Sequence, residues 1–488
     1  MRPLALLALF PSLAAAQYPG SLAVPSELKK GWDAITIKEA RNYLGYLAGP
    51  ETAGRGTGQP GFQKAADFVA GKFKEFGLKP MGDKGTYFQN VPFFRTRIVP
   101  GSLRIELDGT KIGNGGIEIA ALGNKLDGEG TLAVIRTNGG KLPADPDIRN
   151  RLVLVVGELQ GNDSFRLLRS NPLAILQVRQ EVKPYDWSVS RSETRGDIRR
   201  IYGTITEDAA RRMLTAANAD LSLLTLPAEP DKTEVATLSN KITFVAQSET
   251  QPVGVPNVVG LLEGSDPTLK AEIVGIGAHL DHLGLQGDTV YPGADDDGSG
   301  STALLLTARA LTKSAVKPKR SILFMEFCGE EMGLIGSGYY SDHPVFPHDR
   351  MISELQMDMV GRDSDGEQNG DKNRVDKREE NIDTIRLVGS KRISTELDAT
   401  IQRLNVYTGF KFKYDAEDVY TRSDHYNFAK NGIPIAFFFD GFHPDYHQPT
   451  DTIEKIDWIK LTTTARLVYL TAMELATKPN PPVKDVKQ

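Results

Sequence analysis

From about residue 250 to residue 478, apolar runs of strand length alternate with segments of helical periodicity. Strands are expected over 257–262, 273–278, 321–327, 354–360, 385–389 and 433–439, and helices over 299–312, over 336–341 and, as two patterns, within 451–476. Strands that alternate with helices predict an α/β fold. We therefore expect a mixed, mostly parallel central sheet with helices on both faces.

Histidines and carboxylates recur at one topological position, the carboxyl ends of these strands. They are His279, Asp296, Glu330, Glu331, Asp358 and His447. In open α/β sheets, ligands bind outside the carboxyl ends of the strands. These side chains are therefore expected to converge although they are far apart in the sequence.

The residue types at this edge indicate a metal site. Imidazole and carboxylate are zinc ligands, and a buried acidic cluster needs a cation. The donors suffice for two ions if one carboxylate bridges, and Asp296 is the expected bridge because a helix N-terminus can stabilise a buried anion. Asp281 is expected to orient the imidazole of His279. Of Glu330 and Glu331, one can bind metal while the other acts as a general base.

Weaker expectations attach to the polar residues nearby. His282 could be a further ligand but is expected to be a neighbour of the ligands, and His425 is interpreted as part of the site wall. Asp295 and Asp297 are expected to be loop residues. The glycine-rich segment 53–61 lacks the Gly-Lys-Ser/Thr ending of a phosphate-binding loop, so we expect a loop that enters a helix.

The middle of the chain differs in character. Residues 101–245 carry short β-like runs with interspersed helical patterns and no His/Asp/Glu constellation, which predicts a smaller, β-rich, inserted domain. Residues 17–100 and 246–478 are then the two parts of the main domain, and 479–488 a flexible tail. Helices are expected over 37–47 and 60–76, with Gly77 as the C-cap of the second.

The N-terminal residues 1–16 have the three regions of a secretory signal peptide: Arg2, an apolar run over 4–10, and small residues up to Ala16. We expect cleavage after Ala16 and a secreted or periplasmic protein. The run is too short to span ~30 Å of hydrocarbon, and no other stretch approaches transmembrane length. The single cysteine, Cys328, rules out an intramolecular disulfide and is expected to be a buried thiol.

Composition narrows the possible partners. The net charge of −5 and the lack of a basic stripe argue against a nucleic-acid partner. No feature of the sequence favours a particular oligomeric state. The charged and apolar fractions are those of an ordinary globular protein.

The order of the motifs is similar to that of peptidase family M28, the co-catalytic zinc aminopeptidases and their relatives. The resemblance rests on the segments 278–281 (AHLD), 293–300 (GADDDGSG), 327–337 (FCGEEMGLIGS), 358–361 (DMVG) and 446–452 (YHQPTDT). It is strong over about 250–478 and weaker over 30–95. The inserted segment loosely resembles the protease-associated domain that many members carry.

The resemblance implies two zinc ions and a role for each motif residue. It places His279 and Asp358 on one zinc and Glu331 and His447 on the other, with Asp296 bridging, Glu330 as general base and Asp281 supporting the ligand histidine. The implied function is that of an exported zinc-dependent exopeptidase, a metallo-aminopeptidase that hydrolyses N-terminal residues from peptides through a metal-activated bridging water.

Three alternatives remain open. A carboxypeptidase or dipeptidase of the same family would need a cation for the substrate carboxylate, and Arg362 and Arg422 lie near motifs. A glutaminyl cyclase-like acyltransferase uses a related scaffold but typically one zinc. A non-catalytic binding ectodomain is least favoured, since it would have lost ligands and would carry a membrane anchor.

Overall fold

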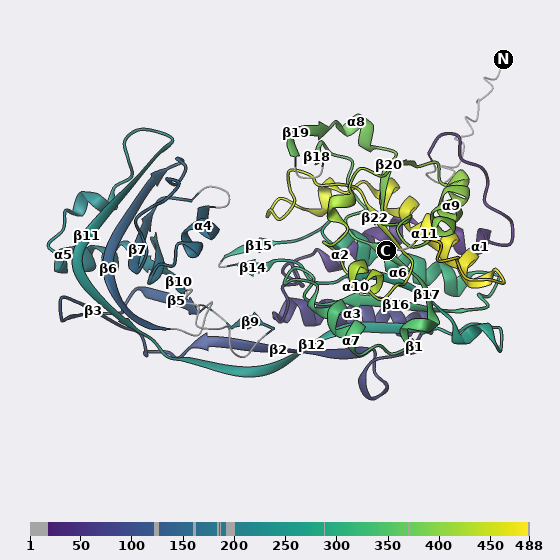
Figure 1. Cartoon of the computed structure of the whole chain (residues 1–488), viewed down its shortest axis with the longest axis horizontal. Coiled ribbons are helices and arrows are strands. Elements are labelled where there is room, and N and C mark those ends of the chain that lie inside the picture. Colours follow the sequence, from purple (N-terminus) through teal and green to yellow (C-terminus); the bar gives the residue numbers. More distant parts are fainter. Residues whose placement is uncertain are drawn as a thin grey trace, which may run out of the picture. The chain divides into compact units, whose positions relative to one another are not determined.

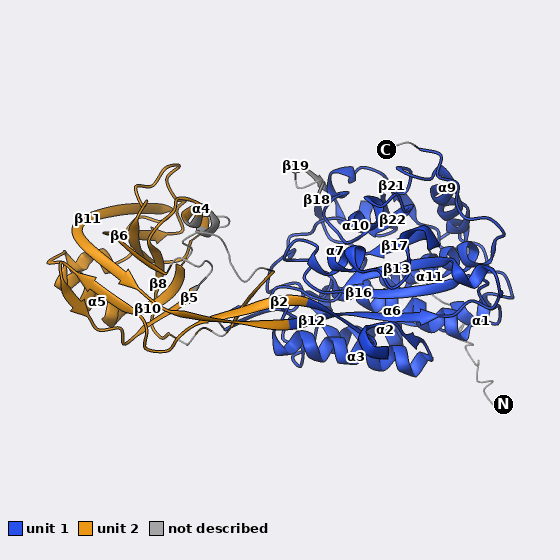
Figure 2. Cartoon of the chain, turned by 60° about the horizontal axis from the view of Figure 1, so that its bottom comes forward, with its two compact units in different colours: residues 1–91, 254–488 blue, residues 92–253 orange. Residues whose placement is uncertain are grey.

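The computed structural model of the chain describes residues 18–121, 126–159, 163–182, 185, 187–191, 201–286, 288–368 and 371–486. The predicted signal peptide, residues 1–16, lies outside this part. The chain forms two compact units, residues 1–91 with 254–488, and residues 92–253 (Figure 2). The second unit is wider than the predicted insertion because its boundaries fall inside two long strands, β2 (Phe88–Ile98) and β12 (Ser248–Leu262).

A mixed sheet forms the centre of the first unit (Figure 1), in the order β21-β20-β22-β17-β13-β16-β12-β2. Its middle strands, β22 (Ile435–Phe439), β17 (Met351–Met357), β13 (Ile273–His279) and β16 (Ser321–Phe327), are mutually parallel. Antiparallel pairs flank them: β12 with β16, and β20 (Thr384–Val388) with β22, while β21 (Lys411–Lys413) lies parallel to β20. The predicted mixed, mostly parallel sheet is confirmed.

One predicted strand has different bounds in the structure. The run 354–360 was expected to be a strand, but β17 spans Met351–Met357, and Asp358 follows the strand instead of lying within it. The polar residues Ser353, Glu354 and Gln356 are fully buried in this strand. A buried strand is predicted from an uninterrupted apolar run, and these polar residues interrupt it. The predicted strand was therefore placed three residues too far toward the C-terminus.

Helices cover both faces of this sheet. They include α6 (Gly298–Lys313) and α11 (Trp458–Thr477) on one face and α7 (Ile335–Asp342) and α10 (His425–Ala429) on the other. Phe327 of β16 packs against Phe428 of α10, with ring centroids 5.9 Å apart. Side chains alternate along a strand, so Glu326 points to the opposite face, where Ser301 of α6 donates a hydrogen bond to it at 2.7 Å. The sheet is therefore buried on both sides.

The N-terminal helices have the predicted bounds, α2 at Ile37–Leu47 and α3 at Pro60–Phe76. Thr36 caps α2 by accepting a hydrogen bond from the Glu39 backbone N–H at 3.2 Å. Gly77 ends α3 with a φ of 77°, the left-handed conformation that glycine adopts without a Cβ clash. Local capping signals thus suffice to place both helices.

The second unit has its own sheet and core. The sheet order is β4-β3-β11-β6-β7-β8-β10-β5, from β4 (Thr110–Ile112), β3 (Arg104–Leu107), β11 (Lys232–Val245), β6 (Asp127–Asn138), β7 (Arg151–Val156), β8 (Ala174–Arg179), β10 (Ile201–Thr206) and β5 (Ile117–Ala121). Its helices are α4 (Asp163–Arg169) and α5 (Glu207–Ala216). Leu132, Leu154 and Phe244 are fully buried in its core. This is the smaller, β-rich unit that the sequence predicts.

Three further segments bear on the predictions. Residues 361–381 contain the hairpin β18 (Gly366–Gln368) and β19 (Asp371–Asp376) followed by α8 (Arg378–Asn381). Residues 479–486, predicted as a flexible tail, hydrogen-bond to the start of α9 (Thr395–Leu404), where the Thr395 N–H donates to Asp485 at 2.9 Å. Among the described helices, none is long and apolar enough to cross a membrane.

Candidate metal centre

The predicted site residues lie at the carboxyl edge of the parallel strands. His279 ends β13, and Asp296 lies two residues before α6. Glu330 and Glu331 follow β16, Asp358 follows β17, and His447 lies in the loop after β22. The fold thus brings together side chains from five separate segments at the place that the topology predicts.

The side chains form two clusters that share one aspartate. In the first, His279 Nε2 lies 3.3 Å from Asp296 Oδ1 and 3.5 Å from Asp358 Oδ1. In the second, His447 Nε2 lies 3.2 Å from Asp296 Oδ2 and 3.0 Å from Glu331 Oε2. Asp296 therefore presents one oxygen to each cluster, as a bridging ligand would.

These clusters fit a metal ion in donor type and charge. The donor atoms of each cluster lie within 4.8 Å of one another. Asp296 Oδ2 and Glu331 Oε1 are buried without a hydrogen-bond partner, and no lysine or arginine in the described part of the chain forms an ion pair with these carboxylates. Burial opposes the protonation of His279, yet Asp358 and Glu330 raise the pKa of His279 well above its usual value. A cation such as zinc, which binds imidazole and carboxylate, suits this arrangement.

Glu330 lies on the wall of the same cavity, beside the first cluster. Its backbone N–H donates a hydrogen bond to Asp281 Oδ1 at 3.1 Å. Burial raises the pKa of Glu330 well above its usual value, and the carboxylates of Asp358 and Glu331 raise it further. Glu330 is thus a carboxyl group disposed to hold a proton next to the donor atoms.

Asp281 connects three parts of the site. Its backbone carbonyl lies 3.0 Å from His279 Nδ1, while its carboxylate lies 3.7 Å from the same nitrogen. The carboxylate accepts hydrogen bonds from Thr57 Oγ1 at 2.6 Å and from the Glu330 N–H. Asp281 therefore orients His279 chiefly through its backbone and positions Glu330 through its side chain.

Arg55, in the glycine-rich segment 53–61, is fully buried under the site. Its guanidinium donates hydrogen bonds to backbone carbonyls on both sides of the centre: Leu280 at 2.8 Å, Leu47 at 2.6 Å, Pro292 at 2.9 Å and Gly293 at 2.8 Å. The segment is a loop that enters α3, as predicted, but it also joins the end of β13 to the loop before α6. Nothing in the sequence indicates this role beyond an arginine between two glycines.

Asp295 and Asp297 are loop residues, as expected, but both are fully buried and hold the backbone of the site. Asp297 accepts hydrogen bonds from the N–H groups of His279 at 3.1 Å, Gly300 at 2.9 Å and Met359 at 3.2 Å. Asp295 accepts one from Gly361 at 2.8 Å. Of the three consecutive aspartates, Asp296 therefore supplies potential metal-ligand atoms, whereas Asp295 and Asp297 accept hydrogen bonds from the backbone.

A second set of charges, most of them buried, lies next to the metal centre, and we call it the Arg362 cluster. It consists of Asp295, Arg362, Asp440, His443, Asp445, Asp451, Lys455 and Lys460. Arg362 pairs with Asp445 at 2.8 Å and with Asp451 at 3.4 Å. Asp451 in turn accepts hydrogen bonds from the N–H groups of Asp295 and Asp296. The Arg362 cluster therefore supports the loop that carries the bridging aspartate.

Aromatic and apolar side chains form the rest of the cavity wall. They are Met359, Val419, Phe437, Phe439, Phe442 and Tyr446, together with Arg422. The exposed guanidinium of Arg422 lies 4.6 Å from the centroid of the Phe442 ring. His425, predicted to belong to this wall, lies behind it: it is fully buried and stacks on Phe437 with centroids 4.6 Å apart.

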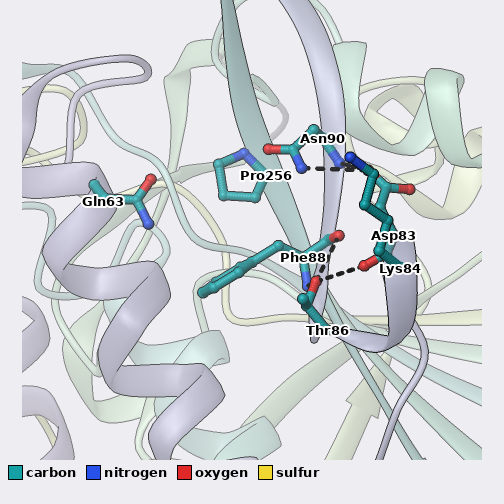
Figure 3. Close-up of a pocket in the computed structure, with 7 residues that line it drawn as sticks. All are labelled: Gln63, Asp83, Lys84, Thr86, Phe88, Asn90 and Pro256. Atoms are coloured by element: carbon teal, nitrogen blue, oxygen red, sulfur yellow. Dashed lines mark hydrogen bonds between the residues drawn. The ribbon is translucent and has the colours of Figure 1, made fainter.

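A larger cavity, of about 590 Å³, lies elsewhere on the first unit (Figure 3). It is lined by Gln63, Asp83, Lys84, Thr86, Phe88, Asn90 and Pro256. The carboxylate of Asp83 accepts hydrogen bonds from Asn90, so it is engaged in holding the turn. The lining offers no group of potential metal donors, and we assign the chemistry to the smaller cavity at the metal centre.

Comparison with known proteins finds similarity to aminopeptidases. Residues 257–472 match the family model described as Peptidase family M28. A probable leucine aminopeptidase of Arthroderma otae is 29% identical over 260 residues, which are 48% of this chain and 67% of that protein. A probable leucine aminopeptidase of Trichophyton verrucosum is 32% identical over 219 residues, 43% of this chain and 56% of that protein. The chain thus spans about half to two thirds of these relatives.

Solved structures share the fold over nearly the whole chain. A zinc aminopeptidase from Bacillus subtilis has a TM-score of 0.53 at 19% identity and covers 96% of this chain and 100% of its own. An M28 peptidase precursor from Shewanella amazonensis has a TM-score of 0.54 at 17% identity and covers 95% and 99%. The resemblance in sequence motifs therefore extends to the three-dimensional fold.

Proposed function

We propose, from the match of residues 257–472 to the model of peptidase family M28, that this chain is a zinc-dependent aminopeptidase that removes N-terminal residues from peptides. The observation that carries the proposal is the pair of donor clusters that share Asp296, with Glu330 beside them on the same cavity wall. His279 and Asp358 would hold one zinc, and Glu331 and His447 the other. This division supports two ions per chain.

The residues of the chain divide the work of hydrolysis. Zinc, when bound, would supply a Lewis acid that polarises the scissile carbonyl and lowers the pKa of water. Glu330 would accept a proton from the attacking water and then deliver it to the amine of the leaving peptide. Asp281 holds Glu330 and His279 in register, so its role is that of a positioning residue.

The aromatic side chains of the cavity wall favour substrates with an apolar N-terminal residue. Phe437, Phe439 and Phe442 lie beside the donor clusters and offer apolar surface to a substrate side chain. The carboxylates of the centre favour the positive charge of a free α-amino group. The relatives named leucine aminopeptidases agree with this substrate class.

Of the alternatives, a carboxypeptidase or dipeptidase depends on a cation for the substrate carboxylate. Arg362 does not supply one, because it is buried and paired with Asp445 and Asp451. Arg422 lines the cavity, is exposed, and in the described part of the chain pairs with no carboxylate. Arg422 is therefore the residue that a carboxylate-dependent activity would use.

Dipeptides with a free, a blocked or an amidated terminus test the proposal. We expect hydrolysis of a free-amine, C-terminally amidated leucine dipeptide, and none of its N-acetylated form. Cleavage of N-blocked substrates with a strict need for a free carboxylate would overturn the aminopeptidase assignment, and Arg422→Met should then abolish that activity. A stoichiometry of one zinc per chain, with cyclisation of an N-terminal glutamine, would instead favour a glutaminyl cyclase.

We also propose that the enzyme is exported, on the signal-peptide pattern of residues 1–16. N-terminal sequencing of the protein recovered outside the cytoplasm should give Gln17 as the first residue. Recovery of the chain with its apolar N-terminus intact would contradict this. The identification of residues 101–245 with a protease-associated domain stays a proposal that rests on the loose sequence resemblance.

A further inference from the structure

His282 lies among the donor atoms of the second cluster although the family resemblance assigns it no role. Its Nδ1 is 2.8 Å from Glu331 Oε1 and 3.6 Å from Asp296 Oδ2. Its ring centroid is 5.6 Å from that of His447. Donor atoms of His282, Asp296, Glu331 and His447 all lie within 4.8 Å of one another. The second cluster therefore contains four potential ligands, whereas the first contains three.

The hydrogen bonding of His282 is incomplete in a way that points to an ion. The side chain is 0% exposed, and neither ring nitrogen has a partner in hydrogen-bond geometry, although Nδ1 lies 2.8 Å from Glu331 Oε1. The facing oxygens, Asp296 Oδ2 and Glu331 Oε1, also lack one. A buried unpaired polar group costs about 1–3 kcal/mol, so three such atoms, with both oxygens within 3.6 Å of His282 Nδ1, are stabilised by a common partner. A cation between them is such a partner.

The surrounding backbone fixes the ring of His282 in this place. The backbone N–H of His282 donates to the carbonyl of Arg55 at 3.3 Å. Gly293 packs against the imidazole so closely that a Cβ at this position would lie 2.4 Å from the ring Cγ. The glycine that opens the 293–300 motif thus leaves room for the ring, and the site is built rather than incidental.

We propose that His282 is a sixth ligand of the metal centre, so that the two zinc ions have unequal coordination. This inference rests on the proposed zinc pair. The ion held by His282, Asp296, Glu331 and His447 would have four protein ligands, the number typical of closed structural sites. The ion held by His279, Asp296 and Asp358 would have three, the number typical of sites that keep a position open for water or substrate.

The inference predicts that the two ions differ in affinity and in function. The four-ligand ion should be the more tightly bound and should remain after mild chelation. The three-ligand ion should exchange readily, and it lies beside Glu330, which shares the cavity wall with His279 and Asp358. Catalysis would then depend on the open ion, while the closed ion fixes Asp296 and Glu331.

Zinc titration of His282→Phe tests the inference without any measurement of catalysis. Calorimetry of the full-length protein, stripped of metal, should show two zinc ions of different affinity in the wild type. In the variant, the tighter affinity should fall at least ~100-fold, more than the loss typical of removing a group that only orients a ligand. The weaker affinity should change little, because His282 contacts neither His279 nor Asp358 in the first cluster.

His425→Phe is a matched control, since it removes an equally buried imidazole outside the centre and should leave both affinities unchanged. His282→Ala serves if the phenylalanine variant does not fold: free imidazole should restore the tighter affinity by filling the space of the ring. Wild-type affinities in either His282 variant, or no response to imidazole, would overturn the inference. A wild-type protein that binds no zinc would instead overturn the proposed function itself.

Discussion

The metal centre and the Arg362 cluster lie side by side at one edge of the sheet, and both bury several carboxylates. In the Arg362 cluster the chain supplies the counter-charges: Arg362 pairs with Asp445 and Asp451, and Lys455 also reaches Asp445 at 2.5 Å. In the metal centre, the described chain places only imidazoles against Asp296, Glu331 and Asp358. Acidity alone therefore does not identify a metal site.

What separates the two regions is the source of the positive charge. In the Arg362 cluster, the ammonium of Lys460 donates hydrogen bonds to the backbone carbonyls of Arg362 at 2.6 Å and Asn381 at 2.5 Å. The chain therefore supplies both this buried cation and its hydrogen-bond acceptors. Buried atoms without a hydrogen-bond partner occur in both regions, but in the described part of the chain no lysine or arginine pairs with Asp296 or Glu331. Because a buried charge without a counter-charge costs several kcal/mol, the carboxylates of the metal centre need a cation from outside the described chain, whereas the Arg362 cluster has its own.

The largest effect on activity is expected at Glu330. It is the one carboxyl group of the metal centre that we propose as a general base and not as a ligand or a positioning residue. Glu330→Gln should lower kcat by about 10²–10⁴-fold, because the amide cannot accept the proton of the attacking water. Steady-state kinetics with a leucine peptide substrate measure this loss.

The control for Glu330→Gln is the adjacent glutamate. Metal analysis should find two zinc ions in Glu330→Gln, whereas Glu331→Gln should bind the Glu331–His447 ion more weakly. Loss of zinc from Glu330→Gln would make Glu330 a ligand, and the division between these two neighbours would be wrong.

A substitution in the Arg362 cluster should lower the stability of the protein and leave its zinc content unchanged. Arg362→Met leaves the buried Asp451 and the neighbouring Asp445 without their guanidinium partner, which should cost about 3–5 kcal/mol in the free energy of unfolding. Denaturant unfolding measures this loss. Zinc stoichiometry, measured on the folded variant, should stay at two.

Arg422→Met is the matched control, since Arg422 is exposed and pairs with no carboxylate among the described residues. The free energy of unfolding should change by no more than about 0.5 kcal/mol in this variant. Equal destabilisation by both substitutions would mean that the Arg362 ion pairs contribute nothing. Loss of zinc from Arg362→Met would mean that the two clusters are one functional unit.

Metal removal should have the complementary effect. Stripping the protein with a chelator leaves the donors of the metal centre uncompensated, and returning zinc at 100 times its Kd should raise stability by about 2.7 kcal/mol through binding to the native state. Thermal unfolding with and without zinc measures the difference. Magnesium should not substitute, because it prefers oxygen ligands to imidazole. A melting temperature that is unchanged by verified metal loss would remove the distinction between the clusters.

The sequence predicted those parts of this picture that depend on local pattern. Strand ends placed His279 and Glu331 at one edge, and capping residues bounded α2 and α3. The hydrogen-bond partners that support these residues were not predicted. Arg55 finds its carbonyls through tertiary contact, and Asp295 and Asp297 have the same side chain as Asp296. Which of three adjacent aspartates meets a metal and which meets backbone N–H groups is decided by the loop conformation, which periodicity does not encode.

Buried polar residues in strands limited the prediction for the same reason. Glu354 and Gln356 interrupt the apolar run of β17, and Glu326 lies inside β16. Burial raises the pKa of Glu326 to about 8, so this carboxyl group lies in an apolar environment, where Ser301 donates to it. Such residues carry no periodic signal, and only the packing of both sheet faces reveals them.

His425, a buried histidine outside both clusters, shows how burial alone changes the pKa of an imidazole in this protein. His425 is fully buried, stacks on Phe437 and hydrogen-bonds through Nε2 to the Tyr420 carbonyl at 2.8 Å. Burial lowers its pKa to about 3, in contrast to His279, whose neighbouring carboxylates raise the pKa. Since the unfolded state protonates near pH 6.5 and the folded state does not, stability should fall as the pH drops from 6.5 toward 3.

The expected loss from this histidine is about 2 kcal/mol between pH 7 and pH 5, since each pH unit below the unfolded pKa costs about 1.4 kcal/mol. His425→Phe should remove that part of the acid sensitivity, because phenylalanine retains the stacking on Phe437 and takes up no proton. Unfolding curves of both proteins at several pH values, with zinc in excess, measure the difference in slope. Parallel pH profiles would show that His425 is protonated in the folded state, and that burial alone does not separate the imidazoles of this protein.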